Sequence, residues 1–169
     1  MRWRRAPVER NVMAAAWNTG LDFNPAKVLV VIDKRTYTRE LVEASGVFGL
    51  NIPSRALAQA TLDVGSISGR ALVEGDKFSR FGLATFPAAM IDVPLLDGCV
   101  GWLECKVIDE PHNQARYDLF IAEVVAARAD SRVFSDGRWH FTEDDSLRTI
   151  HYVAGGNFLG IGESFEVKK

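Results

Sequence analysis

Residue types that support specialised chemistry are scarce in this chain of 169 residues, which has two cysteines and three histidines. Cys99 and Cys105 fall within one apparent strand, where six residues span ~20 Å, which is too far for a disulfide. His112, His140 and His151 show no short spacing with a second ligand. We therefore expect free thiols, a reducing cytoplasm and no metal site.

Charge of one sign and long apolar runs are also limited. The formal net charge is -2 and the pI is about 5.9, which gives no general attraction to nucleic acid or to an anionic membrane. No apolar stretch approaches the ~18 residues of a membrane span, and the basic start MRWRR is not followed by the core of a signal peptide. The length suits one domain with its own core, so we expect a single soluble domain over residues 1–169.

Motifs of covalent catalysis and of nucleotide loops are absent too. Ser, His and Asp occur without a nucleophile elbow. The glycine-rich residues 155–162 lack the spacing and the strand-to-helix context of a Rossmann loop or P-loop, and favour a turn that brings Phe158 over a pocket. Glu104 and Glu123 lie inside apolar strands, where alternation predicts solvent or a salt bridge for each; acid-base catalysis is the less favoured alternative.

The first half of the chain alternates between strand and helix patterns. Residues 26–33 (AKVLVVID) predict a strand covered on both faces, and residues 36–45 a short helix with Thr36 as N-cap and Gly46 after its end. Residues 47–53 predict a second strand and residues 55–64 a helix, followed by a small-polar loop at 65–70.

The second half predicts longer strands. Residues 99–110 and 117–128 form two of them, joined by a turn at residues 111–114, which makes a hairpin. Asp136 and Gly137 predict another turn between residues 133–134 and 139–141, and residues 144–150 one or two helical turns. Long strands with few helices favour a mostly antiparallel β-barrel with short helices at its ends.

Two segments suggest a ligand. Residues 11–17 (NVMAAAW) place three alanines where a strand would carry branched residues, so a flat group is expected against that backbone, beside Trp17. Residues 33–39 (DKRTYTR) combine hydroxyls, cations and a helix start, which suits a phosphate. Together they suit FMN. Taken alone, residues 11–17 also fit a simple core tryptophan, and residues 33–39 a capped helix with solvated cations. Residues 66–70 and 76–78 form a second group of small polar and cationic residues, which equally fits a flexible loop that ends in a helix cap.

Taken in order, NVMAAAW, VLVVIDKRTYTRELVEASGVFGLNIP, GSISGR, GDKFSRFGL, WLECKV and HYVAGGNF resemble the flavin reductase-like FMN-binding split barrels, including the flavoredoxin type. The similarity runs over residues 11–158. It implies a mostly β, antiparallel Greek-key split barrel, FMN near the interface of a homodimer, and NAD(P)H as electron donor.

The resemblance also implies roles for individual residues. The N-terminal segment and Trp17 would lie along the flavin, the threonines and Lys34 would hold the phosphate, the second strand would present backbone to the ring, and the later loop would close the site. Phe158 would cover the ring, from the same or the partner subunit. The implied cofactor-binding residues are Asn11, Ala15, Ala16, Trp17, Lys34, Thr36, Thr38, Asn51, Ile52, Ser68, Gly69, Arg70, Lys77 and Phe158.

Three departures from the family pattern bear on function. Many relatives have Thr at the position of Ala14, and some have His near the position of Tyr117. Relatives usually carry a helix and a first barrel strand before the Asn-containing segment, whereas residues 1–10 precede it here. We expect either a mis-assigned start or a shortened or missing strand that exposes a sheet edge.

The function expected from the resemblance is an NAD(P)H:flavin reductase that passes electrons to an acceptor or a monooxygenase partner. Two alternatives remain. One is an FMN electron carrier of flavoredoxin type without NAD(P)H reactivity, and the other is a flavin-free barrel that binds a small molecule or a protein.

Overall fold

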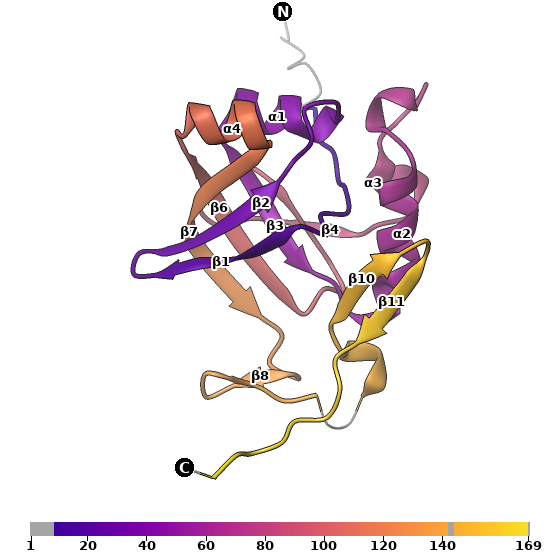
Figure 1. The fold of residues 1–169 in the computed structure, drawn as a ribbon. Helices are drawn as coiled ribbons and strands as arrows, with labels where there is room; N and C mark the ends of the chain where they lie inside the picture. The colour runs from indigo at the N-terminus through magenta and orange to yellow at the C-terminus, as the bar shows by residue number, and fades with distance from the viewer. Residues whose placement is uncertain (1–8, 142–143, 169) are drawn as a thin grey trace, which may run out of the picture.

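A five-stranded antiparallel sheet organises the chain in a computed structural model that describes residues 9–141 and 144–168. The spatial order is β1 (Asn18–Phe23), β2 (Ala26–Val31), β7 (Leu119–Ala129), β6 (Gly101–Ile108), β3 (Val47–Ile52). Every neighbouring pair is antiparallel. Figure 1 shows α1 (Tyr37–Ser45) and α4 (Pro111–Tyr117) over one end of this sheet.

The apolar run at residues 26–33 forms a strand, as predicted, and this strand, β2, has a neighbour on each side in the sheet. Val28 and Val30 are buried, whereas Lys27, Leu29 and Val31 on the other face are only half-buried, so the predicted full cover of both faces is not found. Val30 pairs with Phe120 of β7. The burial of each large apolar side chain is worth ~1.5–3 kcal/mol, which makes this strand pair the base of the core.

One core cluster joins β2 and β7 to helix α1. It contains the buried residues Val30, Ile32, Val42 and Phe120. A second cluster contains Val28, Cys105 and Ala122. Cys99 and Cys105 are free and buried, and loss of hydration raises the pKa of each thiol to about 12.

Helix α1 begins and ends as its sequence predicts. The Thr36 side chain accepts a hydrogen bond from the Arg39 backbone N–H, and Gly46 adopts the left-handed conformation with φ 69°. A residue with a Cβ is strained there, so glycine is the natural end of the helix. The local signals at Thr36 and Gly46 are therefore sufficient to predict where this helix begins and ends.

The turn predicted at residues 111–114 is wrong, because helix α4 occupies this region. Pro111 stands at the first helical position, where its fixed φ and missing N–H are tolerated. Asp118, with φ 55°, ends the helix. Strands β6 and β7 are antiparallel neighbours as expected, but a short helix joins them instead of a tight turn.

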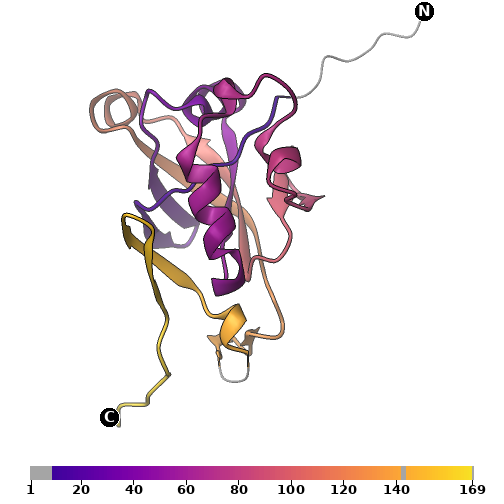
Figure 2. The ribbon, with the colours of Figure 1, turned by 90° about the vertical axis from the view of Figure 1, so that its right-hand side faces the viewer.

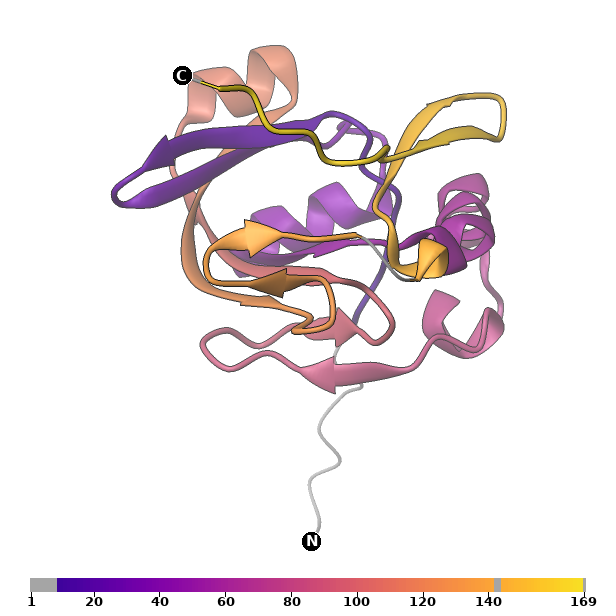
Figure 3. The same cartoon turned by 90° about the horizontal axis from the view of Figure 1, so that it is seen from below.

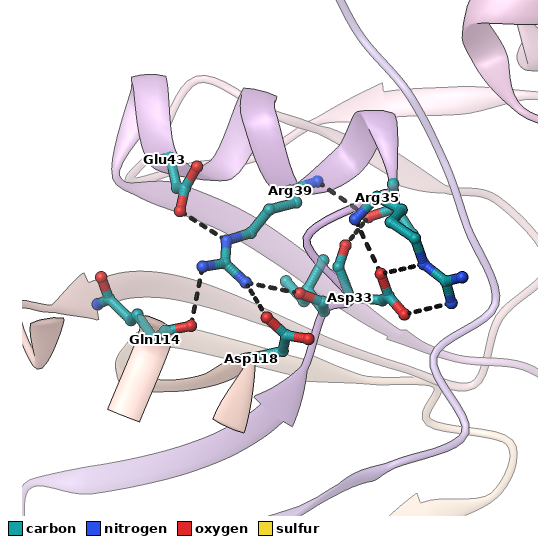
Figure 4. A network of polar contacts seen from close by, with 8 residues as sticks. Asp33, Arg35, Arg39, Glu43, Gln114 and Asp118 are labelled. Atoms are coloured by element: carbon teal, nitrogen blue, oxygen red, sulfur yellow. Dashed lines mark hydrogen bonds and ion pairs between the residues drawn. The ribbon is translucent and has the colours of Figure 1, made fainter. Parts of the chain in front are cut away.

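Arg39 connects α1 to α4 and to the strand ends (Figure 4). Its Nη1 donates to the Ile32 carbonyl at 2.9 Å and to Asp118 Oδ1 at 3.1 Å. Its Nη2 donates to the Gln114 carbonyl at 2.9 Å, and its Nε to Glu43 at 2.6 Å. Because Arg39 is only 5% exposed, this network holds the end of the sheet from inside the fold.

The side of the sheet carries shorter helical elements. The predicted helix at 55–64 is confirmed as a 3-10 turn, Arg55–Leu57, followed by α2 (Ala58–Ser66). The predicted loop at 65–70 is partly helical, since its first two residues belong to α2 and Gly69–Ala71 form a 3-10 turn. Helix α3 (Lys77–Arg80) begins with a capping box at Asp76 and Ser79.

Four further strand pairs or turns complete the described chain. The hairpin β4 (Thr85–Pro87) and β5 (Pro94–Leu96) follows α3. The predicted turn at Asp136 and Gly137 joins β8 (Phe134–Ser135) to β9 (Arg138–Trp139), and one 3-10 turn, Asp145–Leu147, follows. Two glycines then turn β10 (Ile150–Ala154) into β11 (Asn157–Gly160).

Two hairpins differ in how they contact the rest of the fold. The β1–β2 hairpin projects from the sheet in Figures 1 and 3, and every residue of β1 is exposed. The turn of the β10–β11 hairpin lies against α2, because a Cβ at Gly156 would meet a Leu62 methyl at 3.6 Å; Figure 2 shows this hairpin beside α2.

No helix in residues 9–141 and 144–168 is long and apolar enough to cross a membrane.

The segment expected to be strand-like at residues 11–17 is irregular over residues 11–16. It crosses the molecule before β1 begins. The prediction of a shortened first strand concerns residues 1–10, of which residues 1–8 lie outside the described residues. In the described sheet, β1 and β3 are the edge strands.

Candidate functional site

A large open groove lies between the N-terminal segment, α1, β3, α2 and the β4–β5 hairpin, with a volume of about 1650 Å³. Seven of the residues predicted to bind a cofactor line it: Asn11, Ala15, Ala16, Thr38, Asn51, Ile52 and Phe158. Apolar side chains make up much of the wall, including Phe48, Phe86, Met90 and Ile91. A mostly apolar groove with a few placed polar groups is the usual form of a small-molecule site.

The triple alanine lets the N-terminal segment pack closely on one side and leave space on the other. Ala14 lies so near α2 that a Cβ at Gly65 would meet the Ala14 Cβ at 3.2 Å. Ala15 and Ala16 line the groove. Ala14 lines the groove as well, so the small side chains serve both the contact with α2 and the space beside this backbone.

Lys77 holds this segment in place. Its Nζ donates to the Val12 carbonyl at 2.9 Å and to the Val64 carbonyl at 2.6 Å, and the residue is 3% exposed. Loss of hydration lowers the pKa of Lys77 below its ordinary value. Lys77 is not among the groove-lining residues, whereas both of its partners, Val12 and Val64, line the groove, so a direct contact of Lys77 with a cofactor stays a prediction.

One end of the groove is polar. The Asn11 side-chain amide donates from Nδ2 to Thr38 Oγ1 at 2.8 Å. Gly69 permits this arrangement, because a Cβ at that position would lie 2.6 Å from Asn11 Oδ1 and 3.0 Å from the Tyr37 ring. Asn11, Thr38 and Gly69 come from three separate segments, and the fold brings them together; their contact with a cofactor stays a prediction.

The helix start predicted to bind phosphate is only partly available. Thr36 Oγ1 donates to the Asp33 carbonyl at 2.8 Å and also caps α1, so the hydroxyl is used within the chain. Lys34 is exposed, and neither residue lines the groove. Hydrogen bonds from Arg35 lower the pKa of Asp33 to about 2. The phosphate contacts of Thr36 and Lys34 stay predictions.

Gly69 and Arg70 line a smaller depression of about 630 Å³, which shares Glu9, Leu41 and Ala44 with the large groove. Arg70 pairs with Glu40 and lies over the Tyr37 ring at 5.2 Å. The Ser68 side chain caps the 3-10 turn that follows it. Neither Ser68 nor Arg70 lines the large groove, so their role in closing it stays a prediction.

The aromatic residues divide between the groove and the surface. Phe158 lines the groove and packs on Tyr152, with ring centroids 5.1 Å apart. Trp17 is 73% exposed and does not line the groove. Tyr117 is 59% exposed at the end of α4, with its ring edge against His112. Of the two aromatic residues predicted to contact the cofactor, Phe158 lines the groove and Trp17 does not, so a Trp17 contact stays a prediction.

Asn51 connects β3 to the opposite wall. Its Oδ1 accepts from the Leu96 N–H at 2.9 Å, and Trp102 Nε1 donates to the Leu96 carbonyl at 2.7 Å. The β4–β5 hairpin that forms this wall was missed in the sequence, where only Pro87 and Pro94 bracket its turn. Short strands with prolines give little periodic signal.

Glu104 was expected at the solvent or in a salt bridge. The solvent expectation is wrong, because the residue is 1% exposed. The salt bridge is present only as a long contact, 3.9 Å from Arg128 Nη2. The closest partners of the carboxylate are backbone N–H groups of the β4–β5 turn.

Residues 5–147 match the flavin reductase like domain. The chain belongs to this family. It is 43% identical over 155 residues to the uncharacterized protein YddH of Escherichia coli K12, covering 91% of this chain and 80% of that protein.

Solved structures agree with this assignment. An FMN-binding domain of a flavin reductases-like enzyme from Shewanella baltica OS155 matches with a TM-score of 0.91 and 48% identity, over 97% of this chain and 85% of that one. Flavoredoxin of Desulfovibrio vulgaris (Miyazaki F) matches with a TM-score of 0.78 and 26% identity, over 93% and 81%. The predicted fold class, a mostly β antiparallel split barrel with short helices, is confirmed.

Proposed function

We propose that this flavin reductase-like protein binds FMN in the large groove and transfers electrons from NAD(P)H through it to an acceptor or a monooxygenase partner. The observation that carries the proposal is the groove itself, which is apolar along its walls and polar at the end formed by Asn11 and Thr38. The similarity to the FMN-binding domain from Shewanella baltica supports the choice of cofactor.

The residues present fit such a group. Ala15 and Ala16 leave space for a flat ring along the backbone, and a Cβ at Gly69 would collide with Asn11 at the polar end. Bound FMN would supply the redox chemistry, while the chain supplies geometry and excludes water. Asn11 and Thr38 would orient the polar end, Asn51 would support the ring edge, and Phe158 would cover the ring.

A homodimer is part of the proposal. Several large apolar side chains are exposed on β1 and on the chain after β10, including Phe23 at 99%, Leu159 at 62% and Phe165 at 87%. Exposed apolar surface of this kind marks interaction sites. Trp17 would then meet the cofactor or the second subunit at this surface. Analytical ultracentrifugation should show a species of twice 18.7 kDa, and a monomer at micromolar concentration would refute this part.

The test of cofactor and reaction is the visible absorption spectrum with FMN added, followed by anaerobic NADH and then NADPH. Flavin bands that bleach with either nucleotide support the reductase. Bands that bleach only with dithionite support the second candidate, an electron carrier like flavoredoxin, which the similarity to the Desulfovibrio protein favours. No retained flavin would refute both candidates and leave the flavin-free barrel.

Trp17→Ala tests the stacking role of Trp17 in the same titration. A flavin stacked on this ring should lose ~1 kcal/mol or more of binding free energy. Unchanged FMN affinity would show that the exposed Trp17 ring does not contact the cofactor.

A further inference from the structure

The β4–β5 hairpin and its turn form one wall of the groove, and the two strands of this hairpin are very short. The β4–β5 hairpin has three residue pairs, and its turn, residues 88–93, contributes Met90, Ile91, Asp92 and Val93 to the groove. The hairpin appears as the pink strands at the lower edge of Figure 3. So short a hairpin is unstable without further contacts.

The base of this hairpin is anchored to the main sheet. The Leu96 N–H donates to Asn51 Oδ1, and the Leu96 carbonyl accepts from Trp102 Nε1. The Phe86 and Trp102 rings meet edge-on, with their centroids 5.5 Å apart. Gly49 lets β3 approach closely, because a Cβ there would lie 2.8 Å from a Leu95 methyl. None of these contacts reaches the tip of the turn.

Glu104 of β6 reaches the tip. Its Oε1 accepts from the Ala89 N–H at 2.8 Å, and its Oε2 accepts from the Met90 N–H at 2.6 Å. The side chain is 1% exposed, so these charge-assisted bonds are shielded from water. Arg128 Nη2, 3.9 Å away, is the charged side chain that faces the carboxylate, and it is 44% exposed.

The ionised form is the one that this environment favours. Burial pushes the pKa of Glu104 upward, but the N–H groups of Ala89 and Met90 and the Arg128 guanidinium push it down further, so the pKa lies below its ordinary value. Each carboxylate oxygen accepts from one of the two N–H groups. In glutamine one of these oxygens becomes an NH2 group, which donates and does not accept, so in the same geometry one N–H loses its partner.

We propose that Glu104 is a positioning residue, whose buried carboxylate holds the turn at residues 88–93 as one wall of the ligand groove. The part that concerns the ligand rests on the proposed function, with FMN as the occupant. Glu104 itself does not line the groove, so it acts through Met90 and its neighbours.

The experiment compares wild-type protein with Glu104→Gln and with Glu123→Gln. Glu123 is an exposed residue on the adjacent strand β7, so its variant makes the same chemical change without a buried carboxylate. Three quantities are measured in each protein: hydrogen exchange of the amides at residues 88–93, the urea unfolding midpoint, and the dissociation constant for FMN from flavin fluorescence.

We expect the exchange of these amides to rise about tenfold or more in Glu104→Gln, which corresponds to the loss of one charge-assisted hydrogen bond. FMN affinity should fall several-fold under conditions where the variant is fully folded, and Glu123→Gln should behave as wild type. A merely structural role would lower the urea midpoint and leave the affinity of the folded protein unchanged.

Unchanged exchange in Glu104→Gln would overturn the proposal, as would loosened amides with unchanged FMN affinity. If wild-type protein bound no FMN, the proposed function and the ligand part of the proposal would be refuted. The hydrogen-exchange comparison would still test whether Glu104 holds the turn in place. If Glu104→Gln did not fold, the Ala89 and Met90 amides of wild-type protein would decide the question. Exchange as fast as in an unstructured peptide would refute their bonds to Glu104.

Discussion

Replacement of Arg39 by methionine should destabilise the fold more than any surface charge change. Methionine keeps much of the aliphatic volume but removes the guanidinium from a site that is 5% exposed. The carbonyls of Ile32 and Gln114 and the carboxylate of Asp118 then lose their donor. The guanidinium also lies 4.6 Å from the centre of the Phe120 ring, a contact that the variant loses.

The magnitude follows from which of these contacts are buried. Removal of one partner of a buried charged network costs ~3–5 kcal/mol, because the remaining groups are left unpaired. The Glu43 side chain is 48% exposed, so its pair adds at most ~0.5 kcal/mol. We therefore expect Arg39→Met to lower the free energy of unfolding by ~3–5 kcal/mol, a large share of the ~5–15 kcal/mol typical of a domain.

The assay is urea unfolding followed by circular dichroism, with Arg35→Met as the matched control. Arg35 carries the same charge and pairs with Asp33, but its side chain is 85% exposed, so the control should lose ~1 kcal/mol or less. A loss of ~1 kcal/mol or less in Arg39→Met as well would refute the reasoning, because it would show that water replaces the guanidinium without cost.

Three further predictions concern the groove and the core. Gly69→Ala should weaken FMN binding about tenfold or more in a fluorescence titration, since the new Cβ would meet Asn11 Oδ1 at 2.6 Å, and unchanged binding would show that Asn11 moves freely. Lys77→Met should raise hydrogen exchange at residues 11–14 by removing the bond to the Val12 carbonyl; equal exchange would contradict this role. The thiols of Cys99 and Cys105, with pKa raised to about 12, should resist Ellman's reagent in native protein and react in urea, and rapid reaction of native protein would contradict their burial.

Elements with strong local signals could be predicted from the sequence. The β2 run has the branched composition of a central strand, and α1 carries its own signals in Thr36 and Gly46. The two-glycine turn before β11 needs positive φ at Gly155 and Gly156, which few other residues adopt. In each case the deciding energy lies within a few neighbouring residues, so the local pattern suffices.

The region between β6 and β7 shows where local signals fail. Pro111 suits both a turn and the first position of a helix. The fold favours the helix because Arg39 donates to the Gln114 carbonyl within it and to the Asp118 carboxylate at its end. Arg39 and Gln114 are 75 positions apart in the chain. A contact between such distant residues leaves no trace in a local pattern.

The candidate site divides in the same way. The sequence by itself determined the family and singled out Ala15, Ala16, Asn11 and Thr38 as candidate site residues, which line one groove. The hydrogen bond between Asn11 and Thr38 belongs to the tertiary structure. Only the tertiary structure decided which charged groups are buried. The sequence predicts Glu104 at the solvent or in a salt bridge and Lys77 at the cofactor, because burial of a charge is costly unless it is paired. Lys77 and Glu104 are buried because the folded backbone places carbonyls around one and N–H groups around the other, and those partners exist only once distant segments meet.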